Sequence, residues 1–499
     1  MKHINIRKEL IAAILICTIA AGSLAACSAV PDDSQKPLES TASSSSASIA
    51  TSVTGTVTEK DLETQYDESG SVTITLNGDS AESDSSSVSI DGSVITISSK
   101  GTYVLTGTLD DGYVVVDAGK SDDIRIILKD AHITSSDYAA LYCLSADNVY
   151  ITLEDGTENQ LINSGAFTSR DSNNVDGAIF SKTDITINGS GSLEVLSADH
   201  GIVGKDDITI TGGEITVNSS SDGIQANDTV MIQDSIISIT CGKDGIQSDN
   251  DEDLTQGNIY ITSGEITISA GDDGITASSS LQIDGGNINI TGSYEGLEGQ
   301  NITINSGTVT VNSSDDAINA VSAASSDEMF GDDGSTLVIN GGEIYLMTGG
   351  DGVDSNGTFD MTGGTLIVMG PEMGANGSLD VNSSASITGG TVIMAGASGM
   401  ATNFTSAAQG SVLLAVGSQS EGSEIKVVDA SGNVILSLKA SSSYQTILVS
   451  SPDMTTGNSY TITAGNYTET ITLGDFIYGS GSGFGGPGGG GGPDGGFPG

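Results

Sequence analysis

The sequence predicts an all-β chain whose body is a parallel β-helix, in which coils of about 22 residues stack on one another. The first observation behind this prediction is an Asp-Gly-Ile turn, which occurs at Asp222, Asp244 and Asp273. Looser versions of the turn begin at Asp176, Asp199, Glu295, Asp316 and Asp351. Most versions are about 21 to 23 residues apart, and self-similarity at such a period is typical of stacked-repeat folds.

The second observation is a pattern of short strands between the turns, as in Ile208–Ile210 and Ile215–Val217. Their alternation places β-branched residues inward and Thr, Asn or Ser outward. Because one coil cannot bury its own inner face, coils stack and equivalent residues form ladders about 4.8 Å apart. We expect one core ladder to consist of Ile215, Ile236, Ile266, Ile288, Val309, Ile344, Leu366 and Val392.

The third observation is a set of Gly-Gly pairs, such as Gly212-Gly213 and Gly285-Gly286, which allow corners with positive φ. The repeats lack the Leu and Asn signature of a leucine-rich repeat, and they have too few strands for a propeller blade. Two steps are longer, at residues 249–257 and about 322–334. We expect these insertions to leave the stack as loops on one side.

The N-terminus predicts export and a lipid anchor. Lys2, Arg7 and Lys8 precede the apolar run 10–21, and Leu24-Ala-Ala-Cys27 follows it. This arrangement is typical of a lipoprotein signal peptide (residues 1–27) that is lipidated at Cys27, and the alternative is a plain signal peptide with an incidental cysteine. We therefore expect the protein on the extracellular face of the cell membrane or on the cell surface, with the lipid as its only membrane contact.

Four further segments are expected after the signal peptide. Residues 28–70 read as a flexible Ser/Thr-rich linker, and residues 71–400 as the β-helix. Residues 401–475 lose the period and predict an antiparallel β module that caps the open end. The Gly-rich tail, residues 476–499, is low in complexity.

The composition limits the classes of partner that the protein could bind. The chain has 65 acidic against 15 basic residues, a formal charge of −50 and no Trp. Such a surface repels nucleic acid and attracts divalent cations. We expect a monomer. Cys143 and Cys241 lie some four repeats apart, so we expect buried free thiols rather than a disulfide.

The acidic residues of the turns are the candidate metal ligands. Stacked carboxylates about 4.8 Å apart repel by roughly 1 kcal/mol in water and by about 3 to 4 kcal/mol at an effective dielectric of 20. Between residues 171 and 401 the basic side chains are Lys182, Lys205 and Lys243 alone. Several calcium ions would offset the repulsion, and the alternative is that each Asp caps its own turn. The candidate ligands are Asp222, Asp244, Asp249, Asp251, Asp272, Asp273, Glu295, Asp315, Asp316 and Asp351.

The insertion that begins at Asp249 has alternating carboxylates like an EF-hand loop. Leu254 replaces the required Gly and Tyr260 replaces the final Glu, so an EF-hand is not expected. The loop is either part of the calcium site or a solvated acidic loop.

Catalytic signals are weak. The three His residues, His3, His132 and His200, support neither a zinc cluster nor a Ser-His-Asp arrangement. We expect no catalytic residue, and a structural role for His200. If the chain were a polysaccharide lyase, Lys205 and Lys243 would be the candidate bases; otherwise they are counter-charges.

Several segments carry a family resemblance, namely Gly101–Leu109, Val114–Ala118 and Val149–Asn159 together with the Asp-Gly-Ile turns. The region from about Val72 to Gly396 resembles the secreted clostridial-type β-helix carbohydrate-binding domain family, which is similar in fold to calcium-dependent pectate lyases. The resemblance implies a right-handed helix with bound calcium that binds cellulose or acidic sugars such as polygalacturonate. With no Trp for stacking, calcium bridges between the acidic side chains and uronate carboxylates favour an acidic polysaccharide over cellulose.

Three functions remain open from the sequence. The favoured one is a non-catalytic, cell-surface, calcium-dependent carbohydrate-binding lipoprotein. The first alternative is a pectate-type polysaccharide lyase on the same helix. The second is a structural or adhesive surface protein in which calcium only stiffens the stack.

Overall fold

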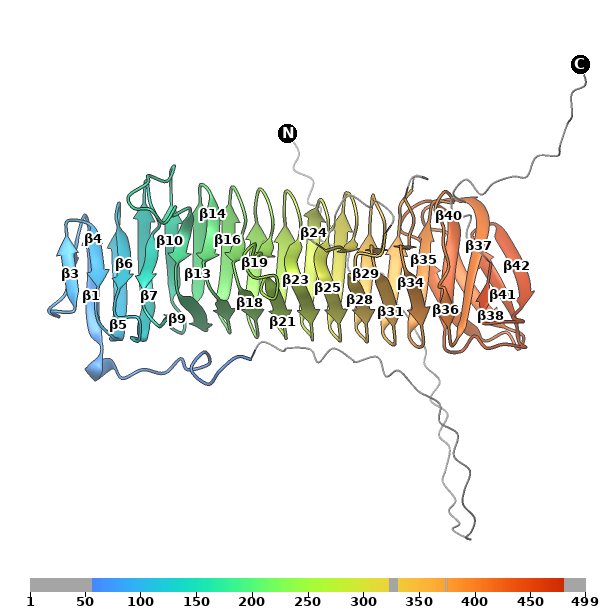
Figure 1. Cartoon of the computed structure of the whole chain (residues 1–499), viewed down its shortest axis with the longest axis horizontal. Coiled ribbons are helices and arrows are strands. Elements are labelled where there is room, and N and C mark those ends of the chain that lie inside the picture. The colour runs from blue at the N-terminus through green and yellow to red at the C-terminus, as the bar shows by residue number, and fades with distance from the viewer. Residues whose placement is uncertain (1–55, 323–330, 373, 375, 480–499) are drawn as a thin grey trace, which may run out of the picture.

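The computed structural model describes residues 56–322, 331–372, 374 and 376–479. Within these ranges the chain is a parallel β-helix whose coils stack along the long axis and end in an antiparallel module (Figure 1). The predicted fold class is therefore confirmed. The predicted signal peptide with Cys27, and most of the predicted linker and tail, lie outside the described residues.

Each regular coil contributes one strand to each of three parallel sheets, which we name S1, S2 and S3. S1 starts with the antiparallel pair β3 (Val88–Asp91) and β4 (Val94–Ile97). It continues with β6 (Tyr113–Asp117), β8 (Leu141–Ser145), β11 (Gly177–Ser181), β14 (His200–Gly204), β17 (Ile224–Ala226), β20 (Ile246–Ser248), the first parts of β23 (Ile275–Ile283) and β25 (Leu297–Ile304), β27 (Ile318–Ala320), β30 (Asp354–Ser355) and β33 (Asp380–Val381).

S2 starts with β1 (Val72–Gly78), which also pairs with the antiparallel strand β2 (Ala81–Glu82). It continues with β5 (Gly101–Leu109), β7 (Ile124–Ser135), β9 (Asn148–Leu153), β12 (Asp184–Gly189), β15 (Ile208–Ile210), β18 (Thr229–Ile232), β21 (Asn258–Ile261), the second parts of β23 and β25, β28 (Thr336–Ile339), β31 (Thr358–Met361), β34 (Ser384–Ile387) and β36 (Ser406–Ala407).

S3 begins at the ends of β5 and β7, which bend from one sheet into the next. It continues with β10 (Glu158–Asn163), β13 (Ser192–Ser197), β16 (Glu214–Ser219), β19 (Ile236–Thr240), β22 (Glu265–Ser269), β24 (Asn287–Ser293), β26 (Thr308–Ser313), β29 (Glu343–Met347), β32 (Thr365–Met369) and β35 (Thr391–Gly396).

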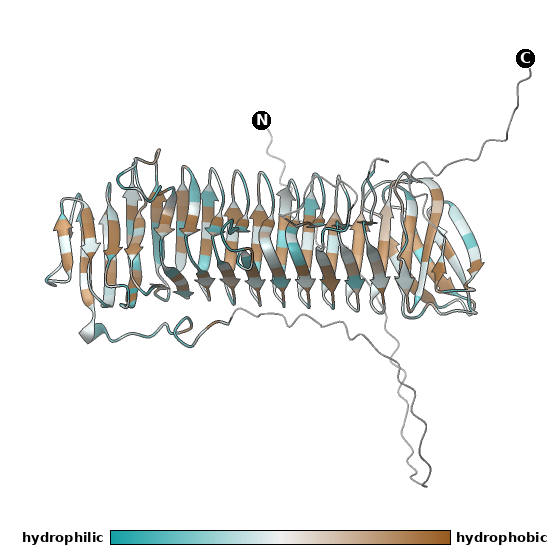
Figure 2. Ribbon diagram, in the orientation of Figure 1, coloured by the Kyte–Doolittle hydropathy of each residue, from teal (hydrophilic) through white to brown (hydrophobic). Residues whose placement is uncertain are grey.

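The core is a column of Ile, Val and Leu enclosed by the three sheets, visible as brown bands that recur from strand to strand (Figure 2). In S3, Ile215 pairs with Ile237, and Ile237 pairs with Ile266. The expected ladder was therefore wrong at one position, because Ile237 is 1% exposed while Ile236 is 52% exposed. Two adjacent Ile residues occur at that step, and the alternation alone could not choose between them.

The corners confirm the expected role of glycine. The second residue of the Gly-Gly pairs lies in the left-handed region, with φ of +88° at Gly213, +89° at Gly286 and +87° at Gly342. Side chains with a Cβ rarely adopt this conformation, so these positions favour Gly.

Part of the predicted linker packs on the helix, which corrects the expectation that residues up to 70 form a free spacer. The backbone carbonyl of Asp61 accepts hydrogen bonds from Asn188 and Thr211 on the outer side of S2 (2.9 and 2.7 Å). Arg125 pairs with Glu63 at 3.1 Å. A three-residue 3-10 helix, η1 (Glu68–Gly70), then leads into β1.

The C-terminal module continues S3 with antiparallel strands. β37 (Gly410–Gln419) pairs with β40 (Tyr444–Ser451), which also pairs with β35, and β43 (Ile477–Tyr478) lies beside β37. A second sheet contains β39 (Val434–Lys439), β38 (Glu424–Asp429), β41 (Ser459–Ala464) and β42 (Tyr467–Thr472). The predicted antiparallel hairpins are therefore present.

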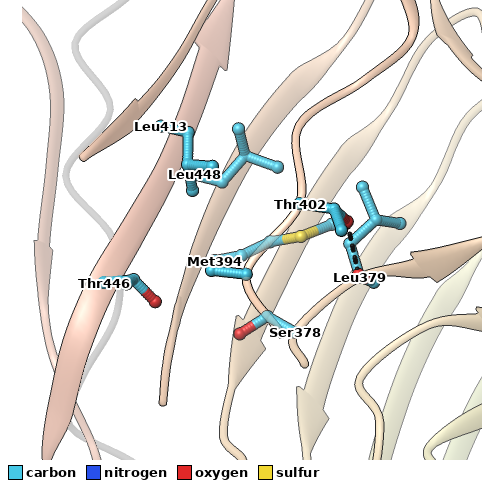
Figure 3. Close-up of a pocket in the computed structure, with 8 residues that line it drawn as sticks. Ser378, Leu379, Met394, Thr402, Leu413, Thr446 and Leu448 are labelled. Atoms are coloured by element: carbon cyan, nitrogen blue, oxygen red, sulfur yellow. Dashed lines mark hydrogen bonds between the residues drawn. The ribbon is translucent and has the colours of Figure 1, made fainter. Parts of the chain in front are cut away.

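The junction between helix and module is tightly filled. Figure 3 shows the small cavity there, which is lined by Leu379 and Met394 from the helix and by Leu413 and Leu448 from the module. Its volume is about 10 Å³, which is about the size of one water probe. The module therefore covers the last coil and shields its strand edge.

Two further observations concern single features. Cys143 and Cys241 are both buried and free, as predicted. Within the part of the chain that the structure describes, no helix is long and apolar enough to cross a membrane.

The register of S3 makes a testable prediction. Ile237→Ala should lower the free energy of unfolding by about 2 to 4 kcal/mol, because it empties a core position. Ile236→Ala, one residue away, should change it by no more than about 0.5 kcal/mol. Denaturant unfolding of the two variants measures the difference, and equal effects would contradict the assigned register.

Candidate functional site

The turn from S3 to S1 places one acidic residue per coil in a row. In this row the Asp222 carboxylate accepts the backbone N–H of Asp244 (3.1 Å), and the Asp244 carboxylate accepts that of Asp273 (3.0 Å). Asp273 accepts the N–H of Glu295 in the same way (3.1 Å). Asp316 continues the pattern toward Asp351 at 2.6 Å. The predicted row therefore exists, and its members follow one another along the stack.

These hydrogen bonds bear on the alternative to a metal site, in which each turn Asp has only a structural role. A turn Asp was expected to cap its own Asp-Gly turn, whereas here the carboxylate caps the N–H of the next coil. In the same turns the N–H of Gly223 donates to the carbonyl of Asp244, and the N–H of Gly245 donates to that of Asp273 (both 2.9 Å). The row thus belongs to the hydrogen bonding that holds successive coils together.

The row also brings carboxylates into groups of three that are suited to a cation. In each group, one oxygen of every residue lies within 4.8 Å of the others. Oxygens at these distances are the ligands of hard cations such as Ca²⁺. The three groups on this row are Asp244–Asp272–Asp273, Asp273–Glu295–Glu298 and Asp316–Asp351–Asp354.

Burial makes the charge of these groups unfavourable. Burial, then the charges of Asp222, Asp273 and Asp272, raise the pKa of Asp244 to about 7. Burial and the neighbouring carboxylates likewise raise the pKa of Asp351 to about 7 and of Asp354 to about 8. The backbone hydrogen bonds act in the opposite direction but leave the pKa values high. These carboxylates therefore lack sufficient compensating positive charge within the protein.

Glu295 and Glu298 lie together in the middle of the row. Burial raises the pKa of both, with a further contribution from the shared hydrogen bond in the case of Glu295. Asn319 Nδ2 donates to Glu295 at 2.8 Å, while the buried Asn319 Oδ1 has no hydrogen-bond partner. On S1, Asn319 pairs with Asp354 of the following coil. An unpaired carbonyl oxygen beside a carboxylate group fits a calcium ligand set, so the residues present suit the ion.

The remaining predicted ligands do not belong to these groups of three carboxylates. Asp222 faces His200, whose Nδ1 lies 2.9 Å from its carboxylate. Although burial acts to lower it, the hydrogen bond with Asp222 and the surrounding carboxylates raise the pKa of His200 overall. The His200 imidazole thus packs against the carboxylate at the N-terminal end of the row.

Asp249, Asp251 and Asp315 are not in the carboxylate groups. Asp315 interacts with Tyr294, whose pKa it raises to about 12. Asp249 and Asp251 belong to the insertion between β20 and β21 and line a separate cavity. Glu298 and Asp354, by contrast, enter the groups from the outer face of S1, although they do not belong to the turn motif.

A second acidic corner, between S1 and S2, was missed. Asp184, Asp206 and Asp207 form a further group of three carboxylates within 4.8 Å. Burial and the charges of Asp184 and Asp228 raise the pKa of Asp206 to about 6. Asp184, Asp206 and Asp228 recur every 22 residues, which is the length of one coil. This spacing predicts an acidic corner, whereas the Asp-Gly-Ile motif does not mark it.

The candidate lyase bases lie on opposite edges of S1. Lys205 follows β14 at the corner with S2, whereas Lys243 precedes β20 at the corner with S3. Aromatic side chains cluster on the outer face of the first S1 strands, where Tyr138, Tyr142 and Phe180 are buried. The guanidinium of Arg170 covers the ring of Tyr138 at 5.3 Å. These rings are therefore packed rather than presented as an open stacking platform.

Part of the chain is similar to known proteins. A family model described as carbohydrate-binding domain-containing protein matches residues 91–328. A curated relative of the same description, from Acetivibrio thermocellus, is 37% identical over 128 residues, which are 25% of this chain and 45% of the relative. The match thus spans less than half of that relative.

One solved structure is also similar. It is described as the polysaccharide lyase-like protein from C. thermocellum, in a gadolinium derivative, and is 35% identical in sequence. The similarity covers 44% of this chain and 90% of that chain, with a TM-score of 0.42.

The raised pKa values predict a pH dependence without metal. Because the folded pKa exceeds the unfolded value, the native state binds more protons, so the free energy of unfolding should fall as pH rises from about 4 to about 8. Thermal unfolding in chelator should therefore show a melting temperature that decreases over this range. Millimolar calcium should abolish the decrease, and Asp354→Asn should reduce it. A melting temperature that is independent of pH in chelator would contradict the assignment.

Proposed function

We propose that this protein is a cell-surface, calcium-dependent carbohydrate-binding lipoprotein that recognises acidic polysaccharide of the polygalacturonate type without cleaving it. The observation that carries the proposal is the row of carboxylate groups at the edge and outer face of S1, with the unpaired Oδ1 of Asn319 beside it. The family match over residues 91–328 supports carbohydrate as the partner.

In the proposed mechanism the turn acids and the strand acids have different roles. Asp244, Asp273, Asp316 and Asp351 hold the turns in register through the backbone of the next coil. Glu298 and Asp354 reach in from the strands and would each complete one ligand set from the outer face, while Asp272 would complete the third from the turn. Bound calcium would supply the positive charge that attracts a uronate carboxylate to an otherwise anionic surface. The helix itself keeps the groups at the fixed spacing of its coils.

The non-catalytic assignment follows the carbohydrate-binding description of the matching family model. Lys205 lies at the corner with S2, away from the row. Lys243 is exposed in the turn directly before Asp244, so it is the candidate base that an activity assay has to test. The lipoprotein assignment rests on the sequence around Cys27 alone.

Binding to polygalacturonate with and without calcium tests the proposal. The wild-type protein should bind only with calcium, and Asp316→Asn together with Asp351→Asn should weaken binding at least tenfold, because two ligands lose their charge. Glu194→Gln, on the exposed outer face of S3, is the matched control and should bind normally. Calorimetry or a pull-down measures the affinity.

Two outcomes of this experiment would overturn the proposal. Release of unsaturated uronate products, lost in Lys205→Ala or Lys243→Ala, would favour the lyase. Retention of no glycan in either condition would favour a structural or adhesive protein.

A further inference from the structure

A large cavity lies beside S1, away from the carboxylate row. It has a volume of about 690 Å³, which is within the range of about 300 to 1,000 Å³ that is usual for small-ligand sites. One wall is the insertion at residues 249–253, and the other carries Lys205, Gln225 and Asn227 from S1 and its corner with S2. The insertion is fixed in this position by Asn250, which donates to Asp228 at 2.6 Å.

The lining suits hydroxyl groups. All the side chains that line the cavity are polar, and together they include amides, carboxylates and one ammonium group. Amide and carboxylate oxygens accept hydrogen bonds, while amide nitrogens and the ammonium donate them. A sugar hydroxyl does both, so a polyol can pair with several of these groups at once.

Lys205 can donate hydrogen bonds to a ligand in this cavity. Its Nζ lies 5.6 Å from the centre of the Phe180 ring, and no carboxylate lies at salt-bridge distance from it among the described residues. The cation–π contact holds the side chain over the ring, while its N–H donors remain available to a ligand.

The cavity is connected to the carboxylate row across S1. Gln225 donates to Gln247 at 3.0 Å, and Gln247 donates to Asp244 at 2.9 Å. Gln225 and Gln247 also pair in register on adjacent strands. A glycan that meets calcium at Asp244 would therefore need to extend only along the short strand β20 to reach the cavity.

The charge of the cavity argues against a second uronate. Asp228, Asp249, Asp251, Glu252 and Asp253 face a single lysine, so a carboxylate ligand would be repelled unless a cation accompanied it. We infer that the cavity between the 249–253 insertion and S1 binds an uncharged sugar unit through hydrogen bonds and without calcium. The inference rests on the proposed carbohydrate-binding function and extends it to a glycan that contains neutral units.

Titration of the purified protein with cellotriose in chelator tests the inference, because this neutral probe does not depend on the carboxylate groups. Cellotriose should bind, and Gln225→Ala and Asn227→Ala should each weaken binding about threefold to tenfold, since each removes a hydrogen-bonding side chain. Thr267→Ala, on the exposed outer face of S3, is the matched control and should leave binding unchanged. Melting curves of each variant confirm that it is folded.

Three outcomes would overturn the inference. They are no binding of cellotriose in chelator, binding only with calcium, and binding that neither Gln225→Ala nor Asn227→Ala weakens. A parallel titration with tri-galacturonate and calcium separates this inference from the proposed function. If tri-galacturonate binds and cellotriose does not, the calcium-dependent function stands and only the neutral subsite falls.

Discussion

The register between successive coils is the constraint on which the rest of this structure depends. Backbone hydrogen bonds place each residue over its equivalent in the next coil, as Ile224 over Ile202 and Ile246 over Ile224. A residue type that recurs once per coil therefore becomes a continuous column. Inside the helix the column is apolar and stable, but at the corner with S1 it is a row of carboxylates whose charges add.

Hydrogen bonds at the corner between S3 and S1 offset the repulsion between these carboxylates only partly. Each turn Asp accepts an N–H from the following coil, so its position is fixed by the same register that stacks the core. One hydrogen bond to a neutral donor does not neutralise a charge, and the pKa values of Asp244, Asp351 and Asp354 remain raised because these side chains are buried among other carboxylates. At the N-terminal end the imidazole of His200 faces Asp222, and its protonated form would supply the opposite charge. Along the rest of the row that role falls, in our proposal, to calcium.

Much of the fold could be predicted from the sequence because a solenoid repeats its local rules. The coil period, the Gly corners and the two insertions followed from spacing alone. Ile236 was misplaced because two Ile residues stand together and only the backbone register decides which one enters the core. Packing of residues 58–66 against S2 gave no periodic signal, since those contacts run to residues between 62 and 150 positions away.

The site was predictable to the same extent. The turn acids were found because one motif marks them, whereas Glu298 and Asp354 occupy outward strand positions that no motif marks and where other coils carry Thr, Asn or Asp. Asp184, Asp206 and Asp228 repeat at the coil length but outside the motif. The cavity beneath the 249–253 insertion depends on the path of an irregular loop, which composition and period do not specify.

The central claim is that the carboxylate row of S1 is a set of calcium sites. A crystal structure of the protein at millimolar calcium and about pH 8, where the ligands are ionised, tests it most directly. The account predicts ions at Asp244–Asp272–Asp273, Asp273–Glu295–Glu298 and Asp316–Asp351–Asp354, with the Oδ1 of Asn319 directed at one of them. A structure under these conditions with water alone between the carboxylates would contradict it.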